Sequence, residues 1–368
     1  MNNLNFSQIN SAEEAAIAFQ AWAEKNNLLK TVIETSIEVE DSVADSIFDS
    51  LAITSQAERK LRTKGIAYIG FNSANDELIV ITDKKLTKAD LGVVPEKINE
   101  TIKVSYIYGS QAQASPPGEN KVRYPYFITP QGKYACGSSI NPAKHVGAGT
   151  MGALVKNTEG EIFGLSNNHV SGMCNFSLEG EKILAPGHLD ITNSGIDPFT
   201  IGYHRRALPF TPGDPYNIEI ADNTDAAIFK ISNESLVSSM QGMYYDTPTT
   251  LSHPTHNALV EKVGRTTGHT EGVIRAKIVT PFGVNYNIPG VGTTVTYFTD
   301  VYMIVSSSGG LFSEPGDSGS LIVSSDSQGN RTAIGLQFAG CNRGNSYMLP
   351  ITPILRELGV SLVSGYNT

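Results

Sequence analysis

The spacing of apolar positions changes twice along the chain. Near the start, Phe19 and Trp22 recur at a helical interval behind Ser11 and Glu14, which have the spacing of a capping box. A second amphipathic stretch covers about 41–62. Both patterns predict a helical N-terminal region whose apolar faces belong to a core.

After this region the period shortens from that of a helix to that of a strand. The stretch GIAYIGFNSANDELIVIT, which starts at Gly65, holds two apolar runs around the polar NSAND and predicts a β-hairpin. The run IKVSYIYG at 102–109 predicts a further strand. The next segment, SQAQASPPGENK at 110–121, has no apolar periodicity and contains two prolines, so it is predicted to be a linker.

From about residue 135 the chain consists of short β-prone runs broken by Gly, Asn, Asp and Pro. Runs such as GTMGALV, EIFGLS, DAAIFKI and AIGLQFA are typical of an antiparallel sandwich or barrel. Within this part TPILRELG, at 352–359, predicts a helix. The predicted division is a helical region at 1–62, a small α+β domain at 63–110, a linker at 111–134 and a β domain at 135–368.

Charge and cysteine content narrow the functional classes. The formal net charge is −9, so we expect no nucleic-acid partner. The start lacks a basic segment leading into an apolar run, and no stretch approaches the ~18 apolar residues that span a bilayer. Three scattered cysteines are too few for a disulfide framework or a zinc site. We therefore expect a cytoplasmic protein with reduced thiols, no membrane contact, no metal and no cofactor.

The segment EPGDSGS at 314–320 places one serine between two glycines, behind an aspartate. Glycine and proline exclude regular structure here and permit unusual backbone dihedrals. The segment is either a surface turn or a loop that holds Ser318 as a nucleophile, with backbone N–H groups directed at an oxyanion. The second interpretation requires a base and an acid elsewhere in the chain.

Histidine is the usual base for a serine nucleophile, because its ordinary pKa of about 6.5 lies near working pH. Of the seven histidines, His169 stands where the predicted strand EIFGLS ends and the pair Asn167 and Asn168 turns the chain. The others lie in predicted loops or turns. Among them, His188 in APGHLD is the alternative base.

Asp225 is the candidate acid, because it directly precedes the apolar run 226–231 and can be buried at a strand edge. Asp222 is the alternative, in a context typical of turns. The chain order is then His, Asp, Ser. No G-x-S-x-G elbow is present, which disfavours an α/β-hydrolase.

The segments SNNHV, TDAAI and EPGDSGS resemble the three signature segments of chymotrypsin-like, or trypsin-like, serine peptidases. LSNNHV is similar to the histidine segment of HtrA/Deg-type proteases. A narrower resemblance, carried by CGSSI, GTMGALV, ILAPGHLD, VGRTTGHTEGVI and GLQFAG, is to disulfide-free bacterial trypsin-like proteins related to the plant narrow-leaf protein. It implies a mainly β fold, with two six-stranded antiparallel β-barrels over 135–368 behind a small helical and α+β N-terminal region.

The resemblance also implies a role for each site residue. His169 would be the general base, Asp225 its orienting acid and Ser318 the nucleophile. The backbone N–H groups of Gly316 and Ser318 would form the oxyanion hole.

A primary specificity pocket is implied as well, with Phe312 near its base and Phe338, Ala339 and Gly340 along one wall. The absence of a carboxylate at Phe312 favours a small or medium apolar substrate side chain over Lys or Arg. The alternative is that Phe312 packs inward and has no part in the pocket.

Together these residues predict an intracellular serine endopeptidase that cleaves protein or peptide substrates through an acyl-enzyme. Residues 1–110 are expected to regulate it or to dock a complex-forming protein, in a bacterial signalling or defence setting. Two alternatives stay open. One is a protease-like fold that serves as a binding module with little turnover, and the other is an esterase that uses the same triad.

Overall fold

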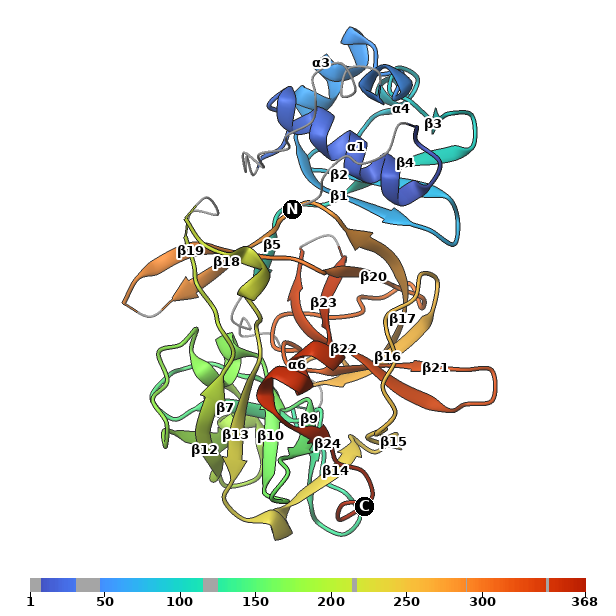
Figure 1. The fold of residues 1–368 in the computed structure, drawn as a ribbon. Coiled ribbons are helices and arrows are strands. Elements are labelled where there is room, and N and C mark those ends of the chain that lie inside the picture. The colour runs from blue at the N-terminus through green and yellow to red at the C-terminus, as the bar shows by residue number, and fades with distance from the viewer. Residues whose placement is uncertain (1–7, 31–46, 115–124, 214–216, 289, 342–343) are drawn as a thin grey trace.

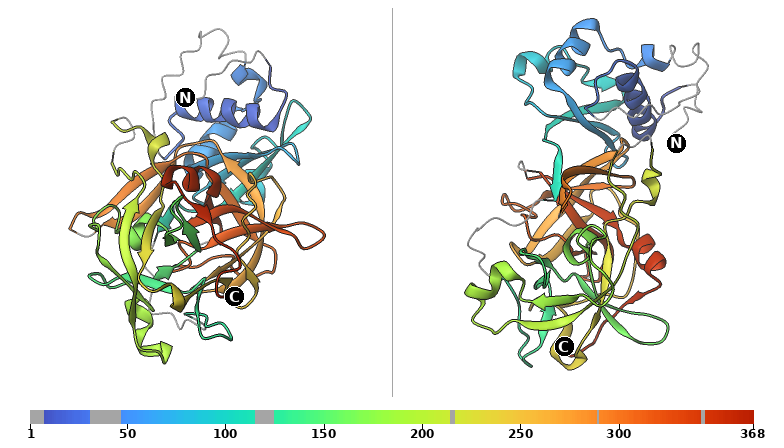
Figure 2. Two further views of the ribbon diagram at one scale, coloured as in Figure 1. Left: turned by 60° about the horizontal axis from the view of Figure 1, so that its bottom comes forward. Right: turned by 90° about the vertical axis from the view of Figure 1, so that its left-hand side faces the viewer.

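The computed structural model describes residues 8–30, 47–114, 125–213, 217–288, 290–341 and 344–368. Three units follow one another along the molecule: an N-terminal unit of helices and strands, a second barrel in the middle and a first barrel at the far end (Figures 1 and 2). The predicted mainly β fold class, with helices near the N-terminus, is confirmed by the element order.

The N-terminal unit begins with the predicted capping box. The N–H of Glu14 donates to Ser11 Oγ at 3.2 Å, and the N–H of Ser11 donates to the Glu14 carboxylate at 3.1 Å. Its helices and strands are α1 (Ala12–Lys25), α3 (Ser55–Lys64), β1 (Ile66–Asn72), β2 (Glu77–Thr82), α4 (Lys88–Leu91), β3 (Lys97–Ile98) and β4 (Ile102–Tyr108). Strands β1 and β2 form the predicted hairpin, and helix α1 packs on both. Residues 41–46 of the second predicted amphipathic stretch lie outside the described residues.

The first barrel, predicted to have six strands, is a curled half-barrel: its eight-stranded sheet has the order β24–β9–β10–β13–β12–β11–β7–β8, and within the described residues the edge strands β24 and β8 do not pair with each other. Its strands are β7 (Ser139–Pro142), β8 (Gly149–Thr150), β9 (Ala153–Lys156), β10 (Ile162–Ser166), β11 (Lys182–Ala185), β12 (Phe199–Ala207), β13 (Ala227–Ile231) and β24 (Ser361–Leu362). Pairing within this sheet is antiparallel, as the short alternating runs predict. A separate small sheet joins β6 (Tyr134–Cys136), β14 (Val237–Gln241) and β15 (Tyr245–Asp246).

The second barrel belongs to a thirteen-stranded sheet that extends beyond the barrel itself. The strands after residue 250 are β16 (Leu259–Gly264), β17 (Gly268–Ile278), β18 (Phe282–Ile288), β19 (Gly292–Phe298), β20 (Tyr302–Ser306), β21 (Leu321–Ser325), β22 (Arg331–Gly340) and β23 (Ser346–Pro350). The predicted helix follows them as α6 (Ile351–Leu358), and it ends at Gly359, whose φ is +68°.

The N-terminal unit shares this sheet with the second barrel. Strand β1 pairs antiparallel with β17, with Gly70 opposite Ile278, so the sheet continues from the unit into the barrel. A Cβ on Gly70 would lie 2.5 Å from the carbonyl oxygen of Lys277, so glycine permits this close approach. The predicted boundary at 110 therefore separates segments of the chain that are joined in space by a β-ladder.

The segment predicted to be a linker at 111–134 contains a strand. Strand β5 (Ala112–Ala114) enters the sheet of the second barrel beside β18 and β22. Its sequence, Ala-Gln-Ala, has no β-branched or aromatic residue, so local propensity does not reveal it and its partners determine it. Residues 115–124 of the predicted linker lie outside the described residues.

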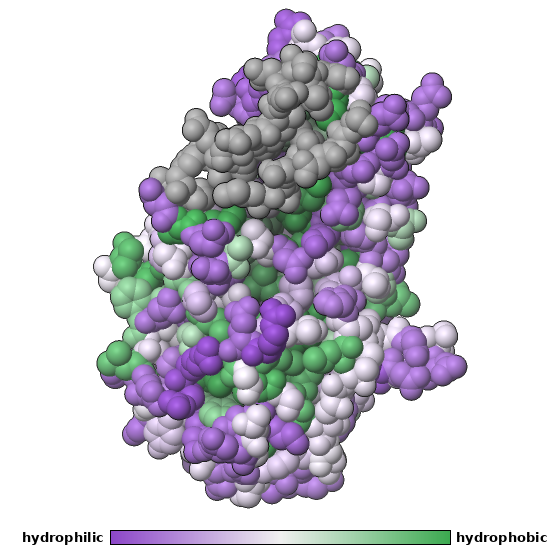
Figure 3. Space-filling model, viewed as in Figure 1, coloured by the Kyte–Doolittle hydropathy of each residue, from purple (hydrophilic) through white to green (hydrophobic). Residues whose placement is uncertain are grey.

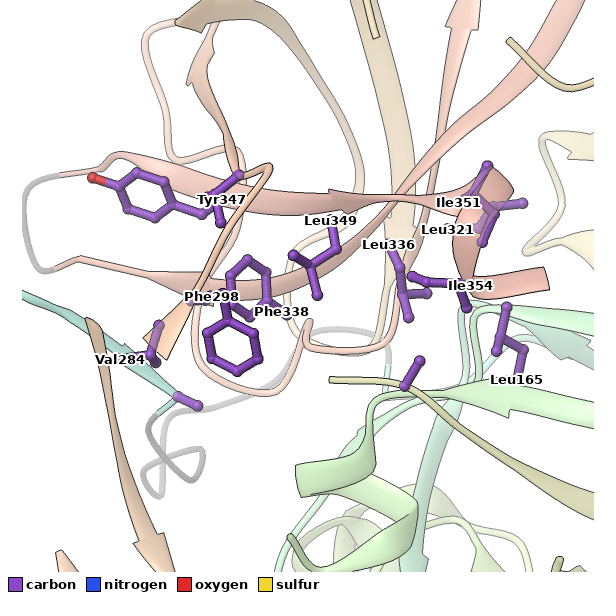
Figure 4. Close-up of a cluster of buried hydrophobic side chains, with 14 of the residues drawn as sticks. Leu165, Val284, Phe298, Leu321, Leu336, Phe338, Tyr347, Leu349, Ile351 and Ile354 are labelled. Atoms are coloured by element: carbon purple, nitrogen blue, oxygen red, sulfur yellow. The ribbon is translucent and has the colours of Figure 1, made fainter. Parts of the chain in front are cut away.

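The two barrels share a hydrophobic core that fixes their relative position. Leu165 of β10 in the first barrel lies near Leu321 of β21 and Ile354 of α6 (Figure 4), and all three are buried in one cluster. Burial of such side chains is the main favourable contribution to folding. On the face drawn in Figure 3, hydrophilic side chains cover much of the N-terminal unit, and hydrophobic ones gather in patches over the barrels.

Candidate active site

The candidate base and acid lie at the same end of two neighbouring strands. His169 follows β10 within the short π-helix η1 (Asn168–Gly172), and Asp225 stands two residues before β13. Strands β10 and β13 pair antiparallel, with Ser166 opposite Ala227. This register brings the end of one strand and the start of the other together, and with them the two side chains.

The imidazole and the carboxylate form a direct contact. His169 Nδ1 lies 2.5 Å from Asp225 Oδ2, and the backbone N–H of His169 donates to Asp225 Oδ1 at 3.0 Å. The side chain of Asp225 is fully buried, whereas that of His169 is 12% exposed. A buried carboxylate requires such donors. Because Nδ1 faces the acid, Nε2 is the nitrogen available to a reacting group.

The two asparagines before His169 fix the segment that carries it. Asn167 Nδ2 donates to the carbonyl oxygen of Asp225 at 2.6 Å, and Asn168 Nδ2 donates to that of Leu208 at 3.2 Å. Both side chains are buried. Of the pair that the sequence analysis interpreted as a turn, Asn167 thus connects the histidine segment to Asp225, and Asn168 connects it to the residue that follows β12 (Phe199–Ala207).

Tyr286 of β18 is a residue that the sequence analysis missed. Its hydroxyl donates to Asp225 Oδ2 at 2.9 Å, and its ring centroid lies 5.4 Å from that of His169. Burial raises the pKa of Tyr286 well above its ordinary value, so the hydroxyl stays protonated and donates. In the sequence it belongs to an apolar strand and has the signature of a core residue.

Ser318 and Gly316 line the same cavity as His169, with a volume of about 240 Å³. Within the described residues, the backbone N–H groups of Gly316 and Ser318 donate to no acceptor, so both are available to a developing oxyanion. Ser318 Oγ and His169 Nε2 make no hydrogen bond in the described part of the chain. Such bonds are often long before substrate binds.

Position 316 requires glycine for two reasons. Its φ is +101°, a conformation that residues with a side chain rarely adopt. A Cβ there would lie 2.4 Å from Thr266 Oγ1 and 2.7 Å from Arg265 Nη1. The loop therefore holds its N–H groups in place only with glycine at this position.

Asp317 fixes the EPGDSGS loop to neighbouring segments through its side chain. Its fully buried carboxylate accepts the N–H groups of Thr266 at 2.8 Å and Glu314 at 3.0 Å, and lies 3.3 Å from Lys262 Nζ. Lys262 is also fully buried, and this burial lowers the pKa of its ammonium although Asp317 counters the effect. The partner of this buried aspartate is thus a lysine of β16, which the sequence analysis did not identify.

A second buried ion pair lies behind Gly316. Arg265 donates from Nε and Nη2 to the two oxygens of Asp190, at 2.7 and 2.6 Å. Ser139 Oγ donates to Asp190 Oδ2 at 2.5 Å. Because Arg265 comes from the second barrel and Asp190 from the first, this bidentate pair helps to hold the loop against both barrels.

A neighbouring cavity of about 210 Å³ opens on the other side of Ser318. Ala339 and Gly340, two of the residues predicted to line the specificity pocket, line this cavity. Phe312 and Phe338 do not, because both are fully buried in hydrophobic clusters where their rings gain more from packing than from exposure. The remaining lining residues include Leu311, Ser313, Glu314, Pro315 and Gln337.

The alternative base and acid lie elsewhere. His188 begins the short helix η2 (His188–Asp190) and its Nδ1 lies 3.3 Å from Asn141 Nδ2; it does not line the cavity of Ser318. Asp222 is exposed in η3 (Ile220–Asp222). The structure therefore brings His169, and not His188, to the cavity of Ser318.

A reactive cysteine, a metal site or a membrane-spanning helix among the described residues would indicate a different chemistry or setting. Cys174 lines the cavity of Ser318, but burial raises the pKa of its thiol, so it stays neutral and a poor nucleophile. Among the described residues, no group of three or more His, Cys, Asp or Glu is placed to bind a metal ion. Nor does that part of the chain contain a helix with the length and hydropathy of a membrane span.

Comparison with known proteins bears out the sequence resemblance. A family model described as "Nal1 C-terminal domain" matches residues 252–352. The protein NARROW LEAF 1 of Oryza sativa subsp. japonica is 29% identical over 230 residues, which cover 56% of this chain and 37% of that protein. The chain is thus a distant homologue of NARROW LEAF 1, and it spans little more than a third of that relative's length.

Solved structures of bacterial and other serine proteases are also similar. The crystal structure of Nocardiopsis protease matches 62% of this chain and 97% of its own, with 20% identity and a TM-score of 0.40. A glutamic acid specific serine protease, described as using a histidine triad in substrate binding, matches 62% of this chain and 100% of its own, with 17% identity and a TM-score of 0.41.

Proposed function

We propose that this chain is a serine endopeptidase that cleaves protein substrates through an acyl-enzyme. One observation carries the proposal: His169, which is bonded to Asp225, and the serine of the EPGDSGS loop line a single cavity, at which two backbone N–H groups have no acceptor among the described residues. A serine hydroxyl, a base held by an acid and an oxyanion site are the components of acyl transfer.

In the first half of the reaction, Ser318 Oγ attacks the carbonyl carbon of the scissile peptide bond. His169 Nε2 takes the hydroxyl proton as the new C–O bond forms, and Asp225 stabilises the imidazolium. The carbonyl oxygen becomes an oxyanion and accepts hydrogen bonds from the N–H groups of Gly316 and Ser318. Each such donor contributes about 3 kcal/mol to transition-state stabilisation.

Collapse of the tetrahedral intermediate breaks the C–N bond. His169 returns its proton to the departing amine, which leaves an ester between Ser318 Oγ and the acyl group. Water then attacks this ester with His169 again as base, and the carboxylic acid leaves while Ser318 regains its proton. The proton balance closes within one turnover, so the residues named are sufficient for the chemistry.

The proposal includes a regulatory or docking role for residues 1–110 and an intracellular setting. The first is supported by the β-ladder between β1 and β17, which joins this region to the barrel of the nucleophile. The second is supported by the three cysteines, which form no disulfide among the described residues.

The test is covalent labelling of the full chain by a small alkyl fluorophosphonate, followed by digestion of casein. We expect labelling of the wild type, no labelling of Ser318→Ala, and loss of casein cleavage by about 10⁶-fold in that variant. Circular dichroism of both proteins controls for folding.

The same experiment separates the alternatives. Well-folded wild-type protein that is never labelled would support the protease-like binding module and overturn the proposal. Labelling together with hydrolysis of short-chain esters but not of casein would support the esterase.

A further inference from the structure

The short strand β5 lies between β18 and β22 in the sheet of the second barrel. It runs parallel to β18, with Ala114 opposite Tyr286, and antiparallel to β22, with Gln113 opposite Gly340. In the described sheet, β18 and β22 are thus neighbours of β5 on its two sides (Figure 1). Because hydrogen-bonded strands lie about 4.8 Å apart, β18 and β22 flank a slot that is one strand wide.

This slot opens at the candidate triad. Ala114 lines the cavity that contains His169 and Ser318, whereas Gln113 lines the neighbouring cavity beside Ser318 and Gly340. Successive side chains of a strand point to opposite sides. Strand β5 therefore contacts both sides of the nucleophile, in the position from which a polypeptide would present a carbonyl group to it.

A polypeptide commonly binds to an exposed strand edge through main-chain hydrogen bonds, while pockets receive its alternate side chains. The edge of β22 ends beside Ser318, and the edge of β18 carries Tyr286, which donates to Asp225. Both edges are suited to a substrate strand by their distance from the reacting groups. In this structure β5 pairs with both.

The burial of β5 indicates which side chains the slot accepts. Ala112 is fully buried and Ala114 is 8% exposed, whereas Gln113 between them is exposed. Small side chains therefore fit at two alternate positions, and the middle position is open to larger and polar ones.

The N-terminal unit holds β5 in place. The backbone N–H of Ala112 donates to the hydroxyl of Tyr68 at 3.0 Å, and this hydroxyl donates to the carbonyl oxygen of Gly283 at 2.6 Å. Tyr68 belongs to β1 and is buried, with its ring stacked on Phe282. One hydroxyl thus connects the N-terminal unit, β5 and β18.

We propose that β5 occupies the place of a bound peptide, and that substrates bind as an extended strand between β18 and β22 after displacing it. This inference rests on the proposed peptidase function and names its substrate class. The substrates are extended polypeptide segments with small side chains at the positions that Ala112 and Ala114 occupy. Small esters and phosphonates that reach Ser318 through the cavity alone do not require the displacement.

The first test compares Gln113→Pro with Gln113→Ala in the full chain. Proline removes one N–H from the β5 ladder, whereas alanine keeps it, so only the proline variant releases the strand. We expect Gln113→Pro to raise kcat/KM for casein at least tenfold and to change the rate of labelling by a small fluorophosphonate less than twofold. Gln113→Ala, which loses the same side chain but keeps the N–H, should raise casein cleavage far less than the proline variant does.

Tyr68→Phe provides a second route, because it removes the hydroxyl that anchors Ala112 and keeps the stacked ring. We expect about a threefold rise in casein cleavage, again with unchanged labelling. If both variants fold and label normally while casein cleavage stays at the wild-type rate, the inference is wrong. If neither they nor the wild type are labelled, the proposed function itself fails, which is a different result.

The second test follows hydrogen exchange of residues 112–114 in the wild type. A tripeptidyl phosphonate with the side chains Ala, Gln and Ala should bond to Ser318 and deprotect the β5 amides at least tenfold. A small alkyl fluorophosphonate should leave their protection unchanged. Protection that persists after complete modification by the tripeptidyl probe would show that the peptide binds elsewhere, and would overturn the inference.

Discussion

The first barrel holds the candidate base and acid, the second barrel holds the candidate nucleophile, and the two halves of the site are built differently. In the first barrel, His169 and Asp225 stand at adjoining ends of two hydrogen-bonded strands. In the second, the loop of Ser318 depends on Lys262 and Arg265 from a different hairpin. Its sheet also takes in β5 and β1 from the region that precedes both barrels.

Because of this difference, substitutions in the two halves should have different effects on catalysis and on folding. The half in the first barrel arises from the pairing of two neighbouring strands, so a change there should alter catalysis and leave the fold intact. The half in the second barrel arises from buried ion pairs between the loop region and other segments, so a change there should affect both folding and catalysis. Four substitutions test this contrast.

The largest effect is expected in the first barrel. Asp225→Asn keeps the size of the side chain but removes the charge that orients His169 and stabilises its imidazolium. We expect kcat to fall about 10⁴-fold with little change in thermal unfolding. Asp222→Asn, at the exposed alternative acid, is the matched control and should have wild-type activity. Equal losses of kcat in both variants would show that Asp225 is not the orienting acid.

In the second barrel, Lys262→Met should destabilise the protein as a whole. It leaves the buried carboxylate of Asp317 without its cation, which costs about 3–5 kcal/mol in the free energy of unfolding. Urea denaturation measures this change. Lys144→Met is the control, because Lys144 is 72% exposed in its pair with Glu181 and should cost less than about 1 kcal/mol. Similar values for the two lysines would contradict the structural role of Lys262.

The junction between the N-terminal unit and the second barrel should respond to acid. Burial alone would raise the pKa of Glu77, but hydrogen bonds from Arg275 and Ser105 lower it from 4.5 to about 2. A carboxylate with a lowered folded-state pKa stabilises the fold above its unfolded pKa, and this contribution is lost as the pH falls toward 2. It amounts to about 3 kcal/mol at neutral pH.

Glu77→Gln should therefore be less stable than the wild type at pH 7, and the difference should shrink as the pH falls from 4.5 to about 2. Denaturant unfolding across this pH range measures it. Glu179→Gln, at an exposed ion pair of the first barrel, should follow the wild type throughout. A difference for Glu77→Gln that is constant with pH would show that its charge does not contribute.

The smallest effect is expected where the two halves meet. Tyr286→Phe removes one of the hydrogen bonds that hold the Asp225 carboxylate in place, so the carboxylate orients His169 less well. We expect kcat to fall about tenfold, which corresponds to about 1.4 kcal/mol, with KM unchanged. A lower yield of folded protein with an unchanged kcat would assign Tyr286 a structural role only. Tyr203→Phe, at an exposed ring of the first barrel, is the control.

The sequence predicts the candidate triad better than the residues that support it. His169 and Asp225 are identified because each adjoins an apolar run, and strand ends can be located from such runs. Lys262 and Tyr286 are not, because each stands inside a β-prone run, and no local pattern shows that its side chain pairs with Asp317 or Asp225.

The same limit applies to the fold. The mainly β class, the β1–β2 hairpin and helix α6 follow from periodicity and are present. The insertion of β5 and the ladder between β1 and β17 are absent from the sequence analysis, because strand order in a sheet is set by tertiary packing. For Phe312 and Phe338 the sequence suggested too much. It placed both residues at a substrate pocket, whereas both side chains are buried in the core.

The ladder between β1 and β17 has a practical consequence for dissecting this molecule. A shortened protein that starts at residue 135 would expose the edge of β17 that β1 now covers, and uncovered edges recruit other chains. It would also lack Tyr68 and Glu77, which contribute buried polar contacts to the remaining part. Aggregation of such a fragment would thus reflect a cut through a continuous sheet, and not an intrinsic failure of the two barrels.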